Sequence, residues 1–402
     1  MTTRFVYMDH AATTATDPRV VEAMLPYFTT HYGNPSSFYS IAREAARALN
    51  DSRKTIADIM GVAPHEIVFT GCGSESDNMA LRGVAWAQRQ AGKGKHLITT
   101  PIEHHAVGHT VEQLVNHFGF EVTYLPVDEY GRVDPDDVGR AIRPETVLVS
   151  VMYANNEVGT IEPIAEIGKI TRSKGIPFHT DAVQAGGTLS IRPDELHVDL
   201  LALSAHKFYG PKGIGLLYVR DGTPLLPTQT GGGQEGHRRA GTENVAYIVG
   251  MAKALSLAYE HAESNNTRIA ELRDRLVQGI LSRIPETRLT GHPTERLPNS
   301  ASFTFKYVEG EAILLNLDMA GVAASSGSAC TTGSDAPSHV LAAMGIPIDE
   351  ARGALRLTLG NENTVEDVDY VIEAVEATIR KLRAMSPLYQ ADSVCADPAS
   401  LP

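Results

Sequence analysis

Residues 177–207 read PFHTDAVQAGGTLSIRPDELHVDLLALSAHK, a stretch with two short apolar runs that each lead into a chemically active side chain. The run at 177–180 is followed by Asp181, and the run at 200–204 is followed by Lys207. The two side chains are 207 − 181 = 26 positions apart, which fits one strand–helix–strand step. We therefore expect Asp181 and Lys207 at the same end of neighbouring strands, where open α/β sheets bind ligands.

The same alternation extends along the chain on both sides of this stretch. Short runs rich in β-branched residues predict further strands at residues 66–70, 95–99, 121–125, 146–152 and 215–219. Helical segments lie between them, at residues 76–91, 105–118 and 164–174. Continuous apolar strands separated by helices predict an α/β fold on a mainly parallel sheet that is covered on both faces.

The pattern changes after about residue 261. An amphipathic segment, two strands and a charged final helix are expected at residues 267–284, 300–305, 354–359 and 365–385. This mixed order predicts a smaller α+β domain. We expect a large domain at 16–260, a small domain at 1–15 and 261–388, and a flexible tail at 389–402.

The composition is that of a globular protein and disfavours several other classes. The chain has 402 residues, 43% of them apolar, and its net charge is −13, with no Lys/Arg cluster that would form a nucleic-acid-binding face. Three widely separated cysteines, Cys72, Cys330 and Cys395, make a poor disulfide framework and indicate a reducing compartment. No run approaches the roughly 20 apolar residues that span a bilayer. We expect a soluble cytoplasmic protein that binds neither nucleic acid nor membrane.

Lys207 and Asp181 have the chemistry that pyridoxal phosphate requires. A lysine just after a buried strand can hold its amine in a low-dielectric pocket, where desolvation makes the amine a nucleophile towards carbonyls. The strand-end carboxylate can keep the pyridine nitrogen of the cofactor protonated, so that the ring acts as an electron sink. Each residue alone has a plainer alternative, since Lys207 could be a solvated loop lysine and Asp181 a helix N-cap.

The phosphate of such a cofactor needs a binding site rich in hydrogen-bond donors. Residues 71–78, GCGSESDN, follow a predicted strand and precede a helix. Glycines there expose backbone N–H groups, the helix N-terminus adds positive potential, and Ser74 can donate its hydroxyl. The dinucleotide pattern G-x-G-x-x-G is absent, and a plain capping box would explain Ser74 and Asp77 about as well. The glycine run at 231–233 is more ambiguous and also fits a simple turn.

Two further strand ends carry polar groups. His104 and His105 follow the strand at 95–99; because adjacent side chains point apart, we weigh a metal site against an imidazole stacked on a planar cofactor ring. Residues 155–157, NNE, follow the strand at 146–152. The repetition of polar groups at several strand ends is more informative than any one of them.

A cysteine and an arginine in the C-terminal part of the chain are the remaining candidate functional residues. Cys330 lies in a polar stretch, SSGSACTTGS at 325–334, which favours an exposed, reactive cysteine over an incidental surface one. Arg356 is a charge inside an apolar strand, and it either extends to solvent at a sheet edge or clamps a carboxylate. We expect Cys72 to pack at its strand–helix junction and Cys395 to have no role.

Together these motifs resemble the cysteine desulfurases that depend on pyridoxal phosphate, in the NifS/IscS branch (group I) of the class-V aminotransferase family. The resemblance runs from residue 7 to about residue 388 and includes the group I signature SSGSAC at 325–330. It is carried by MDHAATT at 8–14, GNPSS at 33–37, ESDN at 75–78, EH at 103–104, NNE at 155–157, DAVQ at 181–184, SAHK at 204–207 and RAGTEN at 239–244. It implies the aspartate-aminotransferase-like fold (fold type I), a homodimer and a Cys330 loop carried by the small domain.

The resemblance also implies roles in catalysis. Lys207 would bind the cofactor covalently, and His104 would stack on its ring and move protons. Asn155 would lie beside cofactor and substrate, and Arg356 would bind the substrate carboxylate. Cys330 would take the sulfur of L-cysteine as a persulfide while L-alanine leaves. No intrinsic metal is implied, although Cys330 could serve as a transient iron–sulfur ligand shared with a scaffold.

The same resemblance assigns the remaining cofactor contacts. Asp181 would pair with the pyridine nitrogen, and Gln184 would contact the ring oxygen. The phosphate would be held by small and basic residues of both subunits: Gly73, Ser74, Ser204, His206 and Thr242 of the partner subunit.

The chain departs from the common pattern at a few positions. Ser74 replaces the usual Thr and keeps the hydroxyl, Ala354 replaces a common Ser or Thr, and His237 stands where Gly is frequent. Residues 335–337, DAP, replace the common Leu-Glu-Pro, which puts loop packing and partner docking in doubt.

Several functions remain open at this point. A selenocysteine lyase, another fold type I aminotransferase or lyase, and a non-catalytic scaffold compete with a cysteine desulfurase. The expected partners are L-cysteine and an iron–sulfur scaffold or another sulfur acceptor. Nitrogenase clusters, general iron–sulfur assembly, tRNA thiolation and DNA phosphorothioation are not distinguished, although residues 234–244 and 296–299 favour the nitrogen-fixation type weakly.

Overall fold

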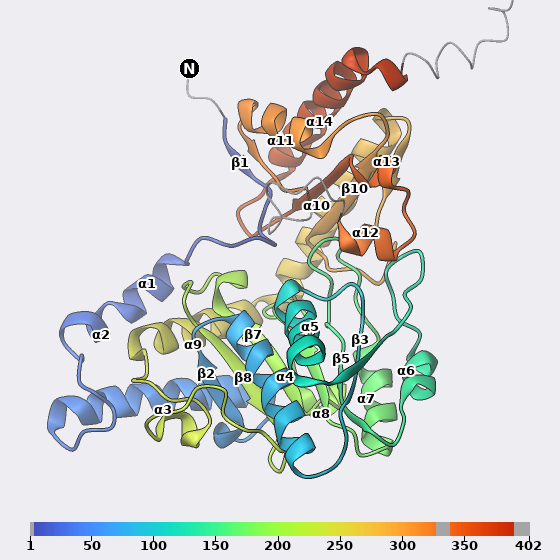
Figure 1. Ribbon diagram of the computed structural model, residues 1–402. Coiled ribbons are helices and arrows are strands. Elements are labelled where there is room, and N and C mark those ends of the chain that lie inside the picture. The colour runs from blue at the N-terminus through green and yellow to red at the C-terminus, as the bar shows by residue number, and fades with distance from the viewer. Residues whose placement is uncertain (1–3, 327–337, 390–402) are drawn as a thin grey trace, which may run out of the picture.

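A seven-stranded sheet forms the centre of the larger part of the molecule (Figure 1). The computed structural model describes residues 4–326 and 338–389. The strands lie in the order β2-β8-β7-β6-β5-β3-β4, and all neighbours are parallel except β8, which is antiparallel to β2 and β7. Their bounds are β2 Ile67–Thr70, β3 His96–Thr99, β4 Glu121–Tyr124, β5 Thr146–Ser150, β6 Phe178–Asp181, β7 Leu200–Ser204 and β8 Gly215–Val219. The mainly parallel α/β sheet expected from the sequence is confirmed.

Helices cover both faces of this sheet because its inner strands are apolar on both sides. Two consecutive residues of β2, Val68 and Phe69, belong to separate hydrophobic clusters on opposite faces of the sheet. One face is covered by α4 Gly73–Gln90 and α5 His105–Phe118. The other is covered mainly by α1 Pro18–Met24, α3 Ser40–Met60, α7 Ile164–Ser173 and α9 Val245–Glu260. Shorter elements join them: α2 Pro26–Thr29, η1 Pro64–Glu66, α6 Pro135–Ala141, α8 Pro193–Leu196, η2 Ala205–Lys207 and η3 Gln234–His237.

Both ends of the chain contribute to a second, smaller core. Val6 and Met8 pack with Phe303 in the same hydrophobic cluster. This part contains an antiparallel sheet in the order β12-β10-β9 and a short parallel pair of β1 and β11. Its elements are β1 Val6–Tyr7, α10 Ala262–Arg283, β9 Thr287–Leu289, β10 Ser300–Phe305, α11 Gly310–Met319, β11 Val322–Ala323, α12 His339–Ala343, α13 Ile348–Ala351, β12 Ala354–Thr358 and α14 Val365–Met385. The domain boundaries at residues 15 and 260 stay a prediction.

Two helix starts differ from the expectation. α4 begins at Gly73, not at residue 76, because the Sγ of Cys72 caps it by accepting the backbone N–H of Glu75 at 3.4 Å. The capping-box interpretation of Ser74 and Asp77 is therefore wrong. α10 begins at Ala262, five positions before the expected start at 267. No helix in residues 4–326 and 338–389 combines the length and apolarity that crossing a membrane requires.

Candidate active site

A cavity of about 370 Å³ opens where β6 and β7 end, between the large sheet and the second part. β6 and β7 are parallel neighbours, which confirms that Asp181 and Lys207 lie at the same end of adjacent strands. The cavity wall includes most of the residues that the sequence singled out: Gly73, Ser74, His104, Asp181, Gln184, Ser204, His206, Lys207 and Arg356.

Lys207 reaches the cavity from η2, directly after β7. Its ammonium donates hydrogen bonds to the carbonyl oxygens of Ala11 at 2.5 Å and Ala12 at 2.8 Å. The side chain of Gln184 donates to the same Ala11 carbonyl at 3.0 Å. The chain that follows β1 therefore holds the amine at one side of the cavity.

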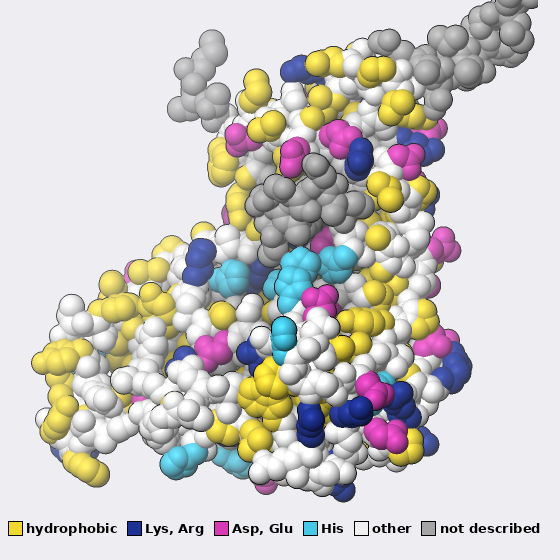
Figure 2. All heavy atoms as spheres, viewed as in Figure 1, with side chains coloured by type: hydrophobic (Ala, Val, Ile, Leu, Met, Phe, Trp, Pro, Cys, Tyr) yellow, Lys and Arg dark blue, Asp and Glu magenta, His cyan; other side chains and the backbone are white. Residues whose placement is uncertain are grey.

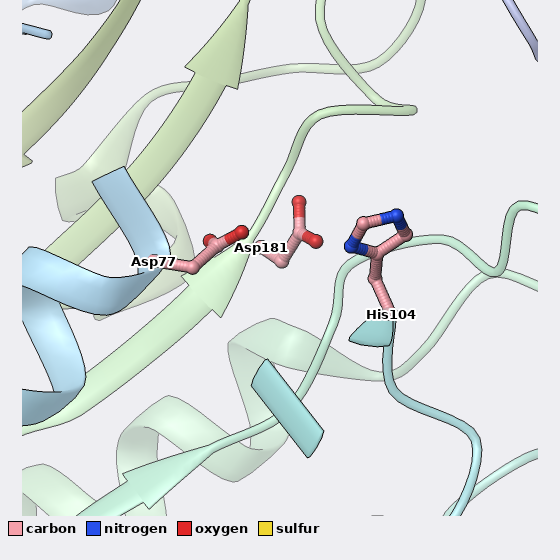
Figure 3. A group of neighbouring side chains, drawn as sticks. All are labelled: Asp77, His104 and Asp181. Atoms are coloured by element: carbon pink, nitrogen blue, oxygen red, sulfur yellow. The ribbon is translucent and has the colours of Figure 1, made fainter. Parts of the chain in front are cut away.

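Two carboxyl groups and an imidazole face one another at the floor of the cavity (Figure 3). Asp77 comes from α4, Asp181 from the end of β6 and His104 from the start of α5, and their ligand atoms all lie within 4.8 Å of one another. Burial raises the pKa of Asp77 well above its ordinary value, and the nearby Asp181 adds to the effect. Burial also raises the pKa of Asp181, but His104, the backbone N–H of Val183 and Lys207 oppose it. Asp181, unlike Asp77, therefore has neighbours that favour its ionised form.

His104 is a neutral base at this site. Its Nδ1 accepts the backbone N–H of Ala106 at 3.1 Å as the N-cap of α5, and burial lowers its pKa. In the described part of the chain, Asp77, His104 and Asp181 are the single group with the spacing of a metal site.

The first turn of α4 forms a cradle at the other end of the cavity. A Cβ on Gly73 would lie 2.8 Å from Val183 Cγ2 and 3.3 Å from Ser204 Cβ, so only glycine lets the start of α4 pack this closely against the chain at the ends of β6 and β7. His206 also faces this cavity, and burial lowers its pKa to about 4, which keeps it neutral. Cys72 is exposed and lines the cavity, so the expectation that it packs at the junction is wrong.

Arg356 points into the cavity from β12. One guanidinium N–H donates to the carbonyl of Asn156 at 2.8 Å and another to Asp9 Oδ1 at 2.7 Å, while Nε has no hydrogen-bond partner among the described residues. The residue is 2% exposed, which excludes the alternative that it extends to solvent at a sheet edge. A buried guanidinium facing a cavity is suited to a carboxylate ligand.

Some expected residues lie elsewhere. The fully buried Asn155 does not line the cavity, since its amide donates to the carbonyl of Ile102 and accepts the backbone N–H groups of Glu157 and Val158. Thr242 lines a separate cavity of about 160 Å³. Cys330 and Cys395 lie outside the described residues.

Comparison with known proteins decides the family. The aminotransferase class-V model matches residues 6–371. The chain belongs to the class-V aminotransferases. It is 55% identical over 383 residues to cysteine desulfurase IscS of Methanosarcina thermophila, covering 95% of this chain and 94% of that protein.

Solved structures agree with this assignment. A NifS-like protein superposes with a TM-score of 0.88 at 38% identity, covering 94% of this chain and 100% of the other. SspA in complex with cysteine superposes with a TM-score of 0.78 at 37% identity, covering 88% and 98%. This class-V aminotransferase is therefore a cysteine desulfurase of the IscS/NifS type with fold type I architecture.

The cofactor of this class-V aminotransferase is pyridoxal phosphate, and the cavity fits it. The backbone N–H groups at the start of α4, where Gly73 and Ser74 line the cavity, can bind the phosphate, and the buried Asp181 can face a protonated ring nitrogen. Lys207 lies within the same cavity wall. The sequence did not predict the contact of Asp9 with Arg356 or the presence of His339 in the cavity wall, because both residues come from segments distant along the chain and neither follows a strand of the large sheet.

Proposed function

We propose that the enzyme removes sulfur from L-cysteine in this cavity, with Lys207, Asp181, His104, Arg356 and Cys330 in the roles expected from their family resemblance. The observation that carries the proposal is that the first four of these side chains face one cavity from four different elements. Pyridoxal phosphate, when bound, supplies an electron sink for the bonds to the substrate Cα. The residues of the protein would bind the cofactor and the substrate, transfer protons and accept the sulfur.

The cofactor would be held at four points. Lys207 would bind it covalently, and Asp181 would pair with its ring nitrogen as a carboxylate. Gln184 would contact the ring oxygen. The phosphate would be held by Gly73, Ser74, Ser204 and His206, with Thr242 of the partner subunit completing the cradle.

Arg356 and His104 would act on the substrate. Arg356 would bind the α-carboxylate of cysteine, for which its buried guanidinium is suited. His104, neutral because burial lowers its pKa, can accept a proton from the incoming cysteine and return one to the product. Sulfur transfer then forms an S–S bond between Cys330 and the substrate sulfur and breaks the substrate C–S bond. The carbon takes up a proton, so the products are L-alanine and a Cys330 persulfide.

Chain connectivity supports a role for Cys330. Ser325 pairs through its backbone with Arg356 of the cavity wall, and Cys330 is 330 − 325 = 5 positions further along. Five residues span at most about 18 Å when extended. A tether of this length allows the Cys330 thiol to approach the sulfur of a substrate whose carboxylate is bound by Arg356.

Replacing Cys330 tests the sulfur-transfer role. Cys330→Ala should keep the visible absorbance of the bound cofactor, because no proposed cofactor contact is removed. It should release no sulfide from L-cysteine in the presence of a reductant, since the acceptor thiol is missing. Full turnover by this variant would refute the assignment.

Replacing Lys207 tests the cofactor link separately. Lys207→Ala removes the amine that binds the carbonyl of the cofactor, so the visible band of the covalent adduct should be lost. The spectrum of protein incubated with pyridoxal phosphate and then desalted measures this. An unchanged band would count against Lys207.

We infer from the same resemblance that the protein is a cytoplasmic homodimer that passes sulfur to an iron–sulfur scaffold or another thiol acceptor. The reducing environment suggested by the cysteine content supports the compartment. A pull-down with the persulfide form of the enzyme would identify the acceptor.

A further inference from the structure

The start of α12 is fastened to the wall of the active-site cavity. The hydroxyl of Ser338, the N-cap of α12, donates to the Oε2 of Glu157. The Nε2 of His339 lies 3.0 Å from the carbonyl oxygen of Glu103, and its ring packs against that of His105 with 4.9 Å between ring centroids. We call these contacts the Ser338 clasp.

The hydrogen bond between Ser338 and Glu157 is buried, and Asn155 supports the turn that carries Glu157. Ser338 is 8% exposed and Glu157 5%, so their hydrogen bond lies largely out of water. Asn155 holds the turn that carries Glu157, because its amide oxygen accepts the Glu157 N–H at 2.8 Å and its amide nitrogen donates to Ile102 at 2.9 Å. This gives the buried Asn155 and Glu157, which the sequence singled out together, a shared structural purpose.

The clasp stands at one end of the segment that contains Cys330. At the other end, Ser325 and Arg356 exchange backbone hydrogen bonds of 3.2 and 2.6 Å. Arg356 and Glu157 line the same cavity. The chain on either side of residues 327–337 is thus attached to one cavity wall, and Cys330 is 338 − 330 = 8 positions from the clasp. Tethering both flanks raises the effective concentration of a thiol near bound substrate.

We propose that Glu157 and Ser338 are positioning residues for sulfur transfer, which hold the C-terminal flank of the Cys330 segment at the cavity so that the thiol meets bound cysteine. This inference rests on the proposed function, because it needs Cys330 as the sulfur acceptor. It assigns Glu157 and Ser338 to one step, formation of the S–S bond, and to neither cofactor binding nor substrate binding.

The test separates the two steps in the holoenzyme. The spectral change when L-cysteine is added reports substrate binding, and mass spectrometry of alkylated, quenched samples reports the Cys330 persulfide in a single turnover. Ser338→Ala should slow persulfide formation about tenfold or more, the loss expected when a buried hydrogen bond is removed and its acceptor is left unpaired. The cysteine-binding spectral change should keep its midpoint. Ser338→Thr, which retains the hydroxyl, should restore the rate.

Further variants test whether a slower rate reflects loss of the Ser338–Glu157 hydrogen bond or a general destabilisation of the fold. Glu157→Gln keeps an acceptor oxygen and should lose less than Ser338→Ala. Thr304→Val removes a similar buried bond, from the Thr304 hydroxyl to Glu350 at 3.0 Å, in the second core, and should leave the persulfide rate unchanged. Amide hydrogen exchange of residues 338–344 should quicken in Ser338→Ala but not in Thr304→Val.

The outcomes are distinguishable. A wild-type enzyme that forms no persulfide on Cys330 would refute the proposed function itself. If the wild type forms the Cys330 persulfide and Ser338→Ala forms it at the same rate, the positioning role of Glu157 and Ser338 would be refuted, while the proposed function would stand. An equal loss in Thr304→Val, or a loss confined to the cysteine-binding midpoint, would also overturn it.

Discussion

Asp181 ends β6 within a group of three buried carboxyl groups. Glu103 is 3% exposed, and burial raises its pKa to about 8, while burial raises the pKa of Asp77 well above its ordinary value. Three negative charges this close in a low-dielectric site would repel strongly. Burial therefore favours the protonated forms of Asp77 and Glu103, whereas His104, Lys207 and the backbone N–H of Val183 favour the carboxylate form of Asp181. This distribution is what a protonated ring nitrogen requires of the cavity floor.

Arg356 offers a test of substrate recognition. Arg356→Lys replaces a planar fork with a single ammonium that cannot bind a carboxylate through two parallel hydrogen bonds. We expect the KM for L-cysteine to rise about tenfold or more, as the loss of one charge-assisted hydrogen bond predicts. Steady-state alanine production measures it. Arg352→Lys, on a half-exposed neighbour, is the matched control and should leave KM unchanged; an unchanged KM in Arg356→Lys would exclude the carboxylate role.

At the residue level, the sequence predicted the positions of side chains that directly follow strands of the large sheet. It did not predict the positions of side chains that come from other segments of the chain. Lys207 and Asp181 were placed correctly because strand order and spacing determine where strand ends meet. Asp9 and His339 could not be placed in this way, since their positions depend on how the second part packs on the sheet. Asn155 follows a strand yet faces backbone groups, which periodicity alone does not reveal.

At the level of elements, apolar runs predicted the strands to within one or two residues, because β5, β6 and β7 are buried on both faces and have few polar interruptions. Helix starts were less predictable. The cap of α4 is a cysteine, a residue that carries no capping signal in sequence. α5 was predicted correctly from residue 105 to residue 118, where Gly119 adopts the left-handed conformation that ends a helix.

The buried Glu162, in the turn before α7, makes the stability of the fold depend on pH. Glu162 is buried, accepts the backbone N–H of Val133, and burial raises its pKa to about 8. The fold therefore holds a proton that the unfolded chain releases above its ordinary pKa near 4.5. This contribution to stability is complete below that pH and is lost as the pH rises towards 8, at about 1.4 kcal/mol per pH unit.

Glu162→Gln cannot release a proton, so its free energy of unfolding should fall less than that of the wild type between pH 5 and pH 8. Urea unfolding at the two pH values measures the difference. Glu166→Gln, on an exposed residue of α7, should follow the wild type. Parallel pH dependence in the wild type and Glu162→Gln would contradict a proton held by Glu162.

At the scale of the whole molecule, the active site lies where two hydrophobic cores meet. A small cluster joins them, in which Met152 and Val158 of the larger part pack against Val340 and Leu341 of α12. The N-terminal segment crosses between the parts, since Met8 is buried in the second core while Ala11 and Ala12 line the cavity. The cavity that holds both Lys207 and Arg356 therefore depends on how the two parts pack together.

The segments around α1, α2 and α3 extend from the larger part and expose a row of apolar side chains (Figures 1 and 2). These exposed residues are Leu25, Phe28, Tyr32, Phe38 and Tyr39, of which Phe38 is 94% exposed. Large apolar patches of this kind mark interaction sites. The exposed apolar residues support the expected homodimer, in which a second copy of the chain would cover the segments around α1, α2 and α3. Thr242 of the partner subunit would then contact the cofactor site.

Phe38→Glu should weaken that dimer, because a carboxylate would have to be buried against apolar side chains. Sedimentation velocity over a dilution series should show the dimer dissociation constant rise about tenfold or more, equivalent to about 1.4 kcal/mol. Cofactor should be lost on dialysis in parallel, since each site would lack its partner's contribution. Met319→Glu, at an 80% exposed position on α11, should change neither property. A Phe38→Glu protein that stays dimeric at the wild-type concentration would place the interface on another face.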